Sequence, residues 1–194
     1  MHVERINQFN KIISTHNQYK SNSFLWVDIR DVWGVTEKKA KKLAKEYCNV
    51  ISFYAVLKAG GFIDVSLYQF MSALKDEPLI NKKGKKTKKK LLRRDGFLRN
   101  KKQICKLYDF DISKVYFETF NVVEGASNLD DKYFYQMKIN QRWKGYHFMG
   151  CYIQGGILYL SDSSKRGIGV RAIDVIKKRY KNGRKCFRWI RLIG

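Results

Sequence analysis

Residues 145–162 constrain the fold of this 194-residue chain more than any other segment. Two apolar and aromatic runs flank the dipeptide Gly155-Gly156. A pair of glycines between such runs is typical of a β-hairpin with a two-residue turn. We therefore predict two antiparallel strands in which Gln154 pairs with Ile157.

This register brings a histidine close to an aspartate. Met149 would lie opposite Asp162, and His147 is on the same face as Met149 because side chains repeat every second residue. His147 and Asp162 are then diagonal neighbours with backbones about 7–8 Å apart, within reach of each other's side chains. A carboxylate beside an imidazole is the orienting half of a nucleophilic triad. The alternative is a structural role, in which Asp162 only begins the following turn.

Helical periodicity dominates the first part of the chain and strand patterns dominate the last part. Apolar residues at helical spacing predict helices over residues 3–13, 24–33, 36–60 and 65–75. Short apolar runs predict further strands over residues 115–123, 133–139 and 186–193, and one more helix is expected at 171–180. This order predicts the α+β class, with N-terminal helices packed on a C-terminal antiparallel sheet.

Composition favours one globular domain over residues 1–194. We divide it into a helical part (1–78), a basic insertion or loop (79–113) and a sheet part (114–194). Apolar residues make up 44% of the chain, which is a globular composition. No apolar run of about 18 residues predicts a transmembrane helix. The first residues lack a signal-peptide profile, so we expect a cytoplasmic protein.

The chain is strongly basic, with a net charge of +23. Such an imbalance favours contact with nucleic acid or another polyanion, although compositional drift in a lysine-rich chain is an alternative source. The charge is densest between residues 82 and 94, which we expect to form a mobile loop or a frayed helix. Its cations could clamp phosphates with little base specificity, or could simply be a solvated insertion. These cations are Lys82, Lys83, Lys85, Lys86, Lys88, Lys89, Lys90, Arg93 and Arg94.

The four cysteines are widely scattered, without a Cys-x-x-Cys pair. We therefore expect no metal site, no cofactor and reduced thiols. Cys48 is predicted to lie on the buried stripe of a helix, and Cys151 lies about 13 Å along the strand from His147. Neither these two nor Cys105 and Cys186 are expected to begin a helix, where a thiol is activated.

A candidate nucleophile is instead found near the N-terminus. Ser23 stands at the head of an apolar helix, and Gln18 precedes it by five residues. A serine with a His-Asp pair can act as a nucleophile.

Taken together, these residues resemble the papain-like superfamily of cysteine peptidases, especially the peptidases that process bacteriocin leaders. The shared order is an upstream glutamine, a nucleophile at a helix start, a histidine that begins a strand and an aspartate that ends the next strand. The C-terminal signature of that group, His-Phe followed by Asp-Ser, is present here as His147-Phe148 and Asp162-Ser163.

The chain also resembles an uncharacterised, plasmid-borne spirochaete family, in which Phe187-Arg188 would stand in the closing strand. The resemblance covers residues 14–33 and 143–194. It implies a papain-like fold and a peptide or protein ligand.

The resemblance implies that Ser23 occupies the nucleophile position, Gln18 supplies an oxyanion-hole donor, His147 is the base and Asp162 orients it. The family has cysteine where this chain has Ser23, and serine requires stronger activation. This departure favours an inactive relative that works by binding. Two alternatives stay open: a basic nucleic-acid-binding protein, and an active peptidase or amidase that uses Ser23 or a cysteine elsewhere in the fold.

Overall fold

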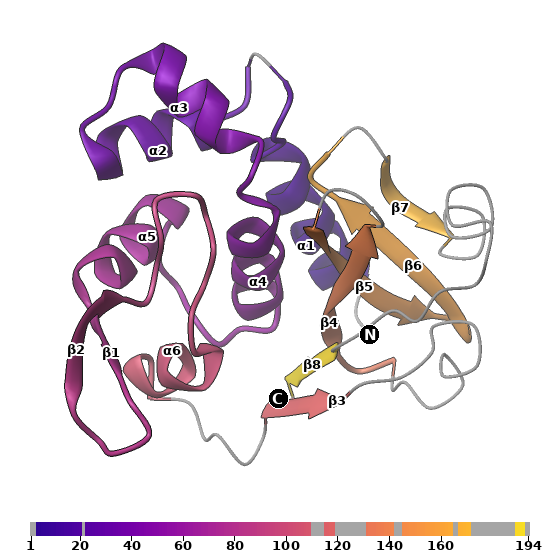
Figure 1. The fold of residues 1–194 in the computed structure, drawn as a ribbon. Helices are drawn as coiled ribbons and strands as arrows, with labels where there is room; N and C mark the ends of the chain where they lie inside the picture. The colour runs from indigo at the N-terminus through magenta and orange to yellow at the C-terminus, as the bar shows by residue number, and fades with distance from the viewer. Residues whose placement is uncertain are drawn as a thin grey trace.

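The computed structural model describes residues 3–20, 22–109, 115–118, 131–141, 145–164, 167–171 and 189–192. Within these ranges the helices come first and an antiparallel sheet follows (Figure 1). The predicted α+β class, with N-terminal helices packed against a C-terminal antiparallel sheet, is confirmed. In these ranges no helix is both long and apolar enough to cross a membrane.

Local capping interactions define several of the helix ends. They are α1 (Val3–Thr15), α2 (Leu25–Trp33), α3 (Glu37–Ala44), α4 (Cys48–Ala59), α5 (Leu67–Asp76) and α6 (Lys101–Leu107). Gly34 ends α2 in the left-handed conformation at φ 57°. The Thr36 side chain caps α3 by accepting a hydrogen bond from the Lys39 backbone N–H. Ser66 and Gln69 form a capping box at the start of α5.

The prediction of a single helix over residues 36–60 is wrong, because the helix is interrupted between α3 and α4. Tyr47 adopts a non-helical conformation there and is fully buried. Its hydroxyl donates to the Arg94 carbonyl oxygen (3.1 Å) and accepts from the Trp33 indole N–H (2.6 Å). These contacts come from segments distant in sequence, so the apolar periodicity, which runs through the break, does not reveal it.

The strands of the main sheet have the spatial order β3-β8-β4-β5-β6-β7. They are β3 (Val115–Glu118), β4 (Phe134–Gln141), β5 (Gly145–Gln154), β6 (Ile157–Asp162), β7 (Gly167–Arg171) and β8 (Trp189–Leu192). Gln154 pairs with Ile157, as predicted. Gly155 and Gly156 have φ values of 55° and 73°, which a two-residue type I′ turn requires.

Strand β7 begins at Gly167 and pairs with β6. The helix predicted over residues 171–180 lies outside the described residues, apart from Arg171 at the end of β7.

The basic segment forms a hairpin, so the prediction of a mobile loop or frayed helix is wrong. Strand β1 (Pro78–Ile80) pairs with β2 (Lys86–Lys90) in a separate two-stranded sheet. In the connecting turn, the Asn81 side-chain oxygen accepts hydrogen bonds from two backbone N–H groups. Leu91 and Leu92 directly follow β2 and are fully buried. Burial of these leucines anchors the hairpin while its lysines project into solvent.

Helix α4 lies at the centre of the fold, with α1 and the sheet on one side and the other helices beyond it (Figure 1). Nearly every residue of α4 is buried. Gly150 allows α1 to approach β5 closely, since a Cβ there would collide with Phe9 and with Ile13. The Gln136 amide of β4 donates to the Asn49 carbonyl oxygen (2.9 Å) and the Ser52 hydroxyl (2.7 Å). These hydrogen bonds fix the N-terminal turn of α4 against the sheet.

Candidate active site

His147 and Asp162 form a buried hydrogen-bonded pair on neighbouring strands. The His147 Nε2 atom lies 2.9 Å from Asp162 Oδ1. Asp162 is 1% exposed and His147 is 8% exposed. The Ser164 backbone N–H also donates to Asp162 Oδ1 at 2.8 Å. The contact between the two side chains, which the hairpin register predicts, is therefore present.

The pair favours an imidazolium beside a carboxylate. Burial by itself lowers the pKa of His147, but hydrogen bonds and charge interactions with Asp162 and Cys48 raise this pKa to about 9. Burial likewise opposes ionisation of Asp162, yet His147 and the Ser164 N–H bring its pKa below the usual value. Both groups are consequently charged near neutral pH.

Cys48 is the cysteine that contacts His147. It is the first residue of α4, so the prediction that no cysteine begins a helix is wrong. Its sulfur interacts with the His147 side chain and raises the pKa of that imidazole. Helix geometry directs the first backbone N–H groups of α4 toward the same region.

One sequence signal could have identified Cys48. The lysine-rich stripe of residues 37–45 gives way to an almost wholly apolar segment at 50–57. Such a change is typical of a surface helix followed by a buried one. Cys48 stands just before the buried segment, at the start of the second helix.

Ser23 has a different environment from the one expected. Its hydroxyl donates to the Thr15 carbonyl oxygen at 3.3 Å and accepts from the Leu25 backbone N–H at 3.2 Å. These bonds join the end of α1 to the start of α2. Among the described residues, no hydrogen bond or ion pair joins Ser23 to His147.

Gln18 connects the two loops that carry the candidate site. Its amide nitrogen donates to the carbonyl oxygens of Ala44 (3.1 Å) and Lys45 (2.7 Å), just before Cys48. Its side-chain oxygen accepts from the Ser163 hydroxyl at 3.1 Å, just after Asp162. Gln18 thus lies close to the site. In this structure its amide hydrogens bind backbone carbonyl oxygens and are not directed at a substrate.

Cys105 and Cys151 are buried in other parts of the fold. Cys105 is fully buried in α6, and burial raises the pKa of its thiol to about 12. The Cys151 thiol lies 3.6 Å from the Tyr135 carbonyl oxygen. Cys186 and the dipeptide Phe187-Arg188 lie outside the described residues.

The predicted nucleic-acid-binding cations gather on the β1–β2 hairpin and the segment after it. All are exposed: Lys82, Lys83, Lys85, Lys86, Lys88, Lys89, Lys90, Arg93 and Arg94. Arg93 forms an ion pair with Asp95. The segment from Lys82 to Arg94 therefore exposes many cations and contains no acidic side chain.

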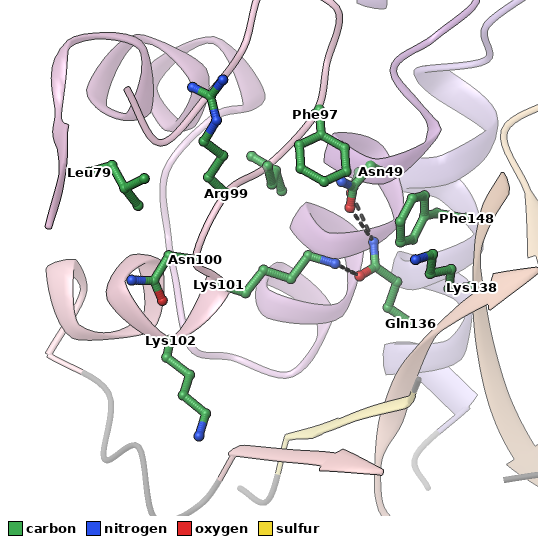
Figure 2. Close-up of a pocket in the computed structure, with 11 residues that line it drawn as sticks. Asn49, Leu79, Phe97, Arg99, Asn100, Lys101, Lys102, Gln136, Lys138 and Phe148 are labelled. Atoms are coloured by element: carbon green, nitrogen blue, oxygen red, sulfur yellow. Dashed lines mark hydrogen bonds between the residues drawn. The ribbon is translucent and has the colours of Figure 1, made fainter. Parts of the chain in front are cut away.

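Two pockets border the segment around Cys48. The larger, of about 510 Å³, is lined by Asn49, which follows Cys48, and by Phe148, which follows His147 (Figure 2). The smaller, of about 320 Å³, is lined by Gln18 and Lys45 among others.

In the part of the chain that the structure describes, no cluster of three or more His, Cys, Asp or Glu side chains could hold a metal ion. Comparisons with family models, with curated proteins and with solved structures gave no match to this chain.

The ion pair predicts a pH-dependent contribution to stability. Because the folded-state pKa of His147 is raised, its contribution is complete below about pH 6.5 and is lost as the pH rises through about 9. Asp162→Asn should therefore lower the free energy of unfolding by about 2–3 kcal/mol near pH 6 and by less near pH 10. Urea denaturation at both pH values measures the difference. An equal loss at both values would contradict the ion pair.

Proposed function

We propose that this chain is a papain-like thiol hydrolase, a peptidase or amidase with Cys48 as its nucleophile. The observation that supports this proposal is the position of one imidazole between a buried carboxylate and a cysteine at a helix start. A nucleophile, a base and a group that orients the base are the parts that such catalysis needs. The papain-like resemblance has the same three kinds of group, although it aligns the nucleophile position with Ser23 and not with Cys48.

The reaction follows from these three side chains. The Cys48 sulfur attacks the substrate carbonyl carbon, with its proton already held by the charged His147 imidazole. The tetrahedral intermediate then collapses as His147 protonates the departing amine, which leaves a thioester on Cys48. Water, deprotonated by His147, attacks the thioester carbon and releases the acid and the thiol. Asp162 keeps the imidazole oriented throughout.

The start of α4 offers stabilisation for the oxyanion. The first backbone N–H groups of a helix have no intrahelical acceptor, and the helix dipole favours negative charge there. Donors of this kind lower the energy of a tetrahedral intermediate. In this proposal Gln18 is a positioning residue, because it holds the backbone before Cys48 and the loop after Asp162.

This assignment replaces the reading of an inactive relative. That interpretation assumes that Ser23 occupies the nucleophile position and that no cysteine is available there. In the present proposal the Cys48 thiol lies beside His147 and takes the place of that serine. A cysteine needs less activation than a serine to act as a nucleophile.

Alkylation tests the assignment of the nucleophile without knowledge of the substrate. Iodoacetamide should modify Cys48 faster than Cys105 or Cys151, as measured by mass spectrometry of peptides. His147→Ala should slow the modification of Cys48 by about tenfold or more, because the sulfur then has no imidazole beside it to hold its proton. Cys48→Ala should abolish the cleavage of a quenched fluorescent peptide library.

Ser23→Ala is the matched control for the two candidate nucleophiles. It removes the Thr15 and Leu25 hydrogen bonds and should lower stability by about 1 kcal/mol while cleavage persists. Loss of cleavage in folded Ser23→Ala protein, with cleavage retained in Cys48→Ala, would contradict the proposal.

A second function, polyanion binding, is favoured by the β1–β2 hairpin. Its lysines are held on a paired strand and exposed to solvent, so phosphate contact does not first require the segment to become ordered. A surface of this kind binds nucleic acid through phosphates and releases counterions. It is compatible with a hydrolase site elsewhere on the fold.

Charge-matched variants test this second function. Replacing Lys85, Lys86, Lys88 and Lys89 with glutamine should weaken the binding of single-stranded DNA at least tenfold and reduce its salt dependence, as measured by fluorescence anisotropy. The control replaces four exposed lysines around α3, namely Lys38, Lys39, Lys42 and Lys45. Equal weakening in both variants would indicate only net charge, and no binding at low salt would exclude the function.

A further inference from the structure

A tight turn after strand β2 carries an exposed aromatic ring. Leu92 forms a β-bridge with Leu98. Next to this bridge, the Arg93 backbone N–H donates to the Phe97 carbonyl oxygen at 3.0 Å. Side chains of such a pairing alternate between its two faces. The two leucines are accordingly 1% and 3% exposed, whereas the Phe97 side chain, on the other face, is 41% exposed.

The turn is anchored on the buried side chain of Tyr47. The Tyr47 hydroxyl donates to the Arg94 carbonyl oxygen at 3.1 Å. Gly96, in the same turn, has a φ value of 75°, and a Cβ at this position would lie 2.6 Å from the Tyr47 ring. The Gly96 backbone N–H donates to the Arg93 carbonyl oxygen at 3.0 Å. The backbone that carries Phe97 is therefore held in place, so a partner does not have to order it on binding.

Two arginines share the exposed face with Phe97. The Arg93 guanidinium lies 5.8 Å from the centre of the Phe97 ring. It also forms an ion pair with Asp95, so its charge is partly balanced. Arg99 follows Phe97 by two residues, which places it on the same face of the pairing. The ring is thus a small apolar surface beside cations.

This face adjoins the cationic β1–β2 hairpin. The Arg99 guanidinium donates to the carbonyl oxygen of Lys90, the last residue of β2, at 2.9 Å. Lys89 precedes Arg93 by four residues, so their backbones are at most about 14 Å apart. One short stretch of a polyanion could therefore contact both the exposed lysines and the turn.

An exposed ring beside phosphate-binding cations matches the chemistry of a single-stranded nucleic acid. In such complexes the bases stack on aromatic side chains while basic groups follow the backbone. The bases of a duplex are stacked on one another and do not offer a free face to a protein ring. A polyanion without bases would engage the lysines and leave Phe97 unused.

We propose that Phe97 stacks on a base of a single-stranded nucleic acid whose phosphates are bound by the β1–β2 hairpin. The inference rests on the polyanion binding proposed above and names the class of polyanion. Stacking on one ring is tolerant of sequence, because every base has a π-face. The site would therefore recognise unpaired bases without selecting among them.

Fluorescence anisotropy with an oligothymidylate and an abasic strand of equal length and charge tests the stacking. Wild-type protein should bind the oligothymidylate about tenfold more tightly than the abasic strand. Phe97→Leu should reduce this ratio to about twofold or less, because leucine is apolar but has no ring. Phe97→Trp should retain the ratio. Phe97→Leu should leave both the binding of a duplex and the salt dependence unchanged, since it removes no phosphate contact.

Phe24→Leu is the matched control. Phe24 is 62% exposed and lies at the start of α2, outside the turn, so its replacement should leave the ratio at the wild-type value. Equal binding of the oligothymidylate and the abasic strand by wild-type protein would overturn the stacking. So would a ratio that is unchanged in Phe97→Leu protein, or one that falls equally in the Phe24→Leu control.

The polyanion function is judged separately by the variant with four lysines of the hairpin replaced by glutamine. If this variant loses salt-dependent binding and wild-type protein does not distinguish the two strands, the polyanion function stands and the stacking is overturned. If no strand binds at low salt, both are overturned. Tighter binding of polyglutamate than of an oligothymidylate of equal charge would overturn the nucleic acid as occupant in favour of an acidic polypeptide.

Discussion

The hydrogen bond between His147 and Asp162 depends on the register of a single hairpin. In β5 and β6 successive side chains face opposite sides of the sheet, so a slip by one residue would separate the pair. The turn at Gly155-Gly156 prevents such a slip, because both residues have positive φ values that suit a two-residue turn. A local backbone preference thus determines a contact between two buried and oppositely charged groups.

The third member of the cluster is positioned by tertiary contacts. Helix α4 is buried on all sides, and the Gln136 amide fixes its first turn against β4. Gln18 ties the backbone before Cys48 to the loop after Asp162. The cysteine therefore meets the histidine because the helix start is held from both sides. A buried Gln amide left without partners would be unfavourable by about 1–3 kcal/mol, which makes these arrangements specific.

The difference between local and tertiary control explains what the sequence could predict. The hairpin, the caps at Thr36 and Ser66 and the α+β order follow from short-range rules and are present in the structure. The break before Cys48 is held by hydrogen bonds of Tyr47 to distant residues, and the apolar periodicity runs through it. In the sequence, only the change from a lysine-rich to an apolar segment indicates it. The lysine-rich strand β2 is equally hidden, since its pairing with β1 and the burial of Leu91 outweigh repulsion between like charges.

The central claim is that Cys48 and His147 act as one unit, and titration of the His147 ring tests it most directly. In wild-type protein, nitrogen-15 NMR of the imidazole should give a pKa of about 9, to which Asp162 and Cys48 both contribute. In Cys48→Ala protein the pKa should be lower, because only the Asp162 contribution is left. An unchanged His147 pKa in the Cys48→Ala variant would contradict the interaction on which the proposed mechanism depends.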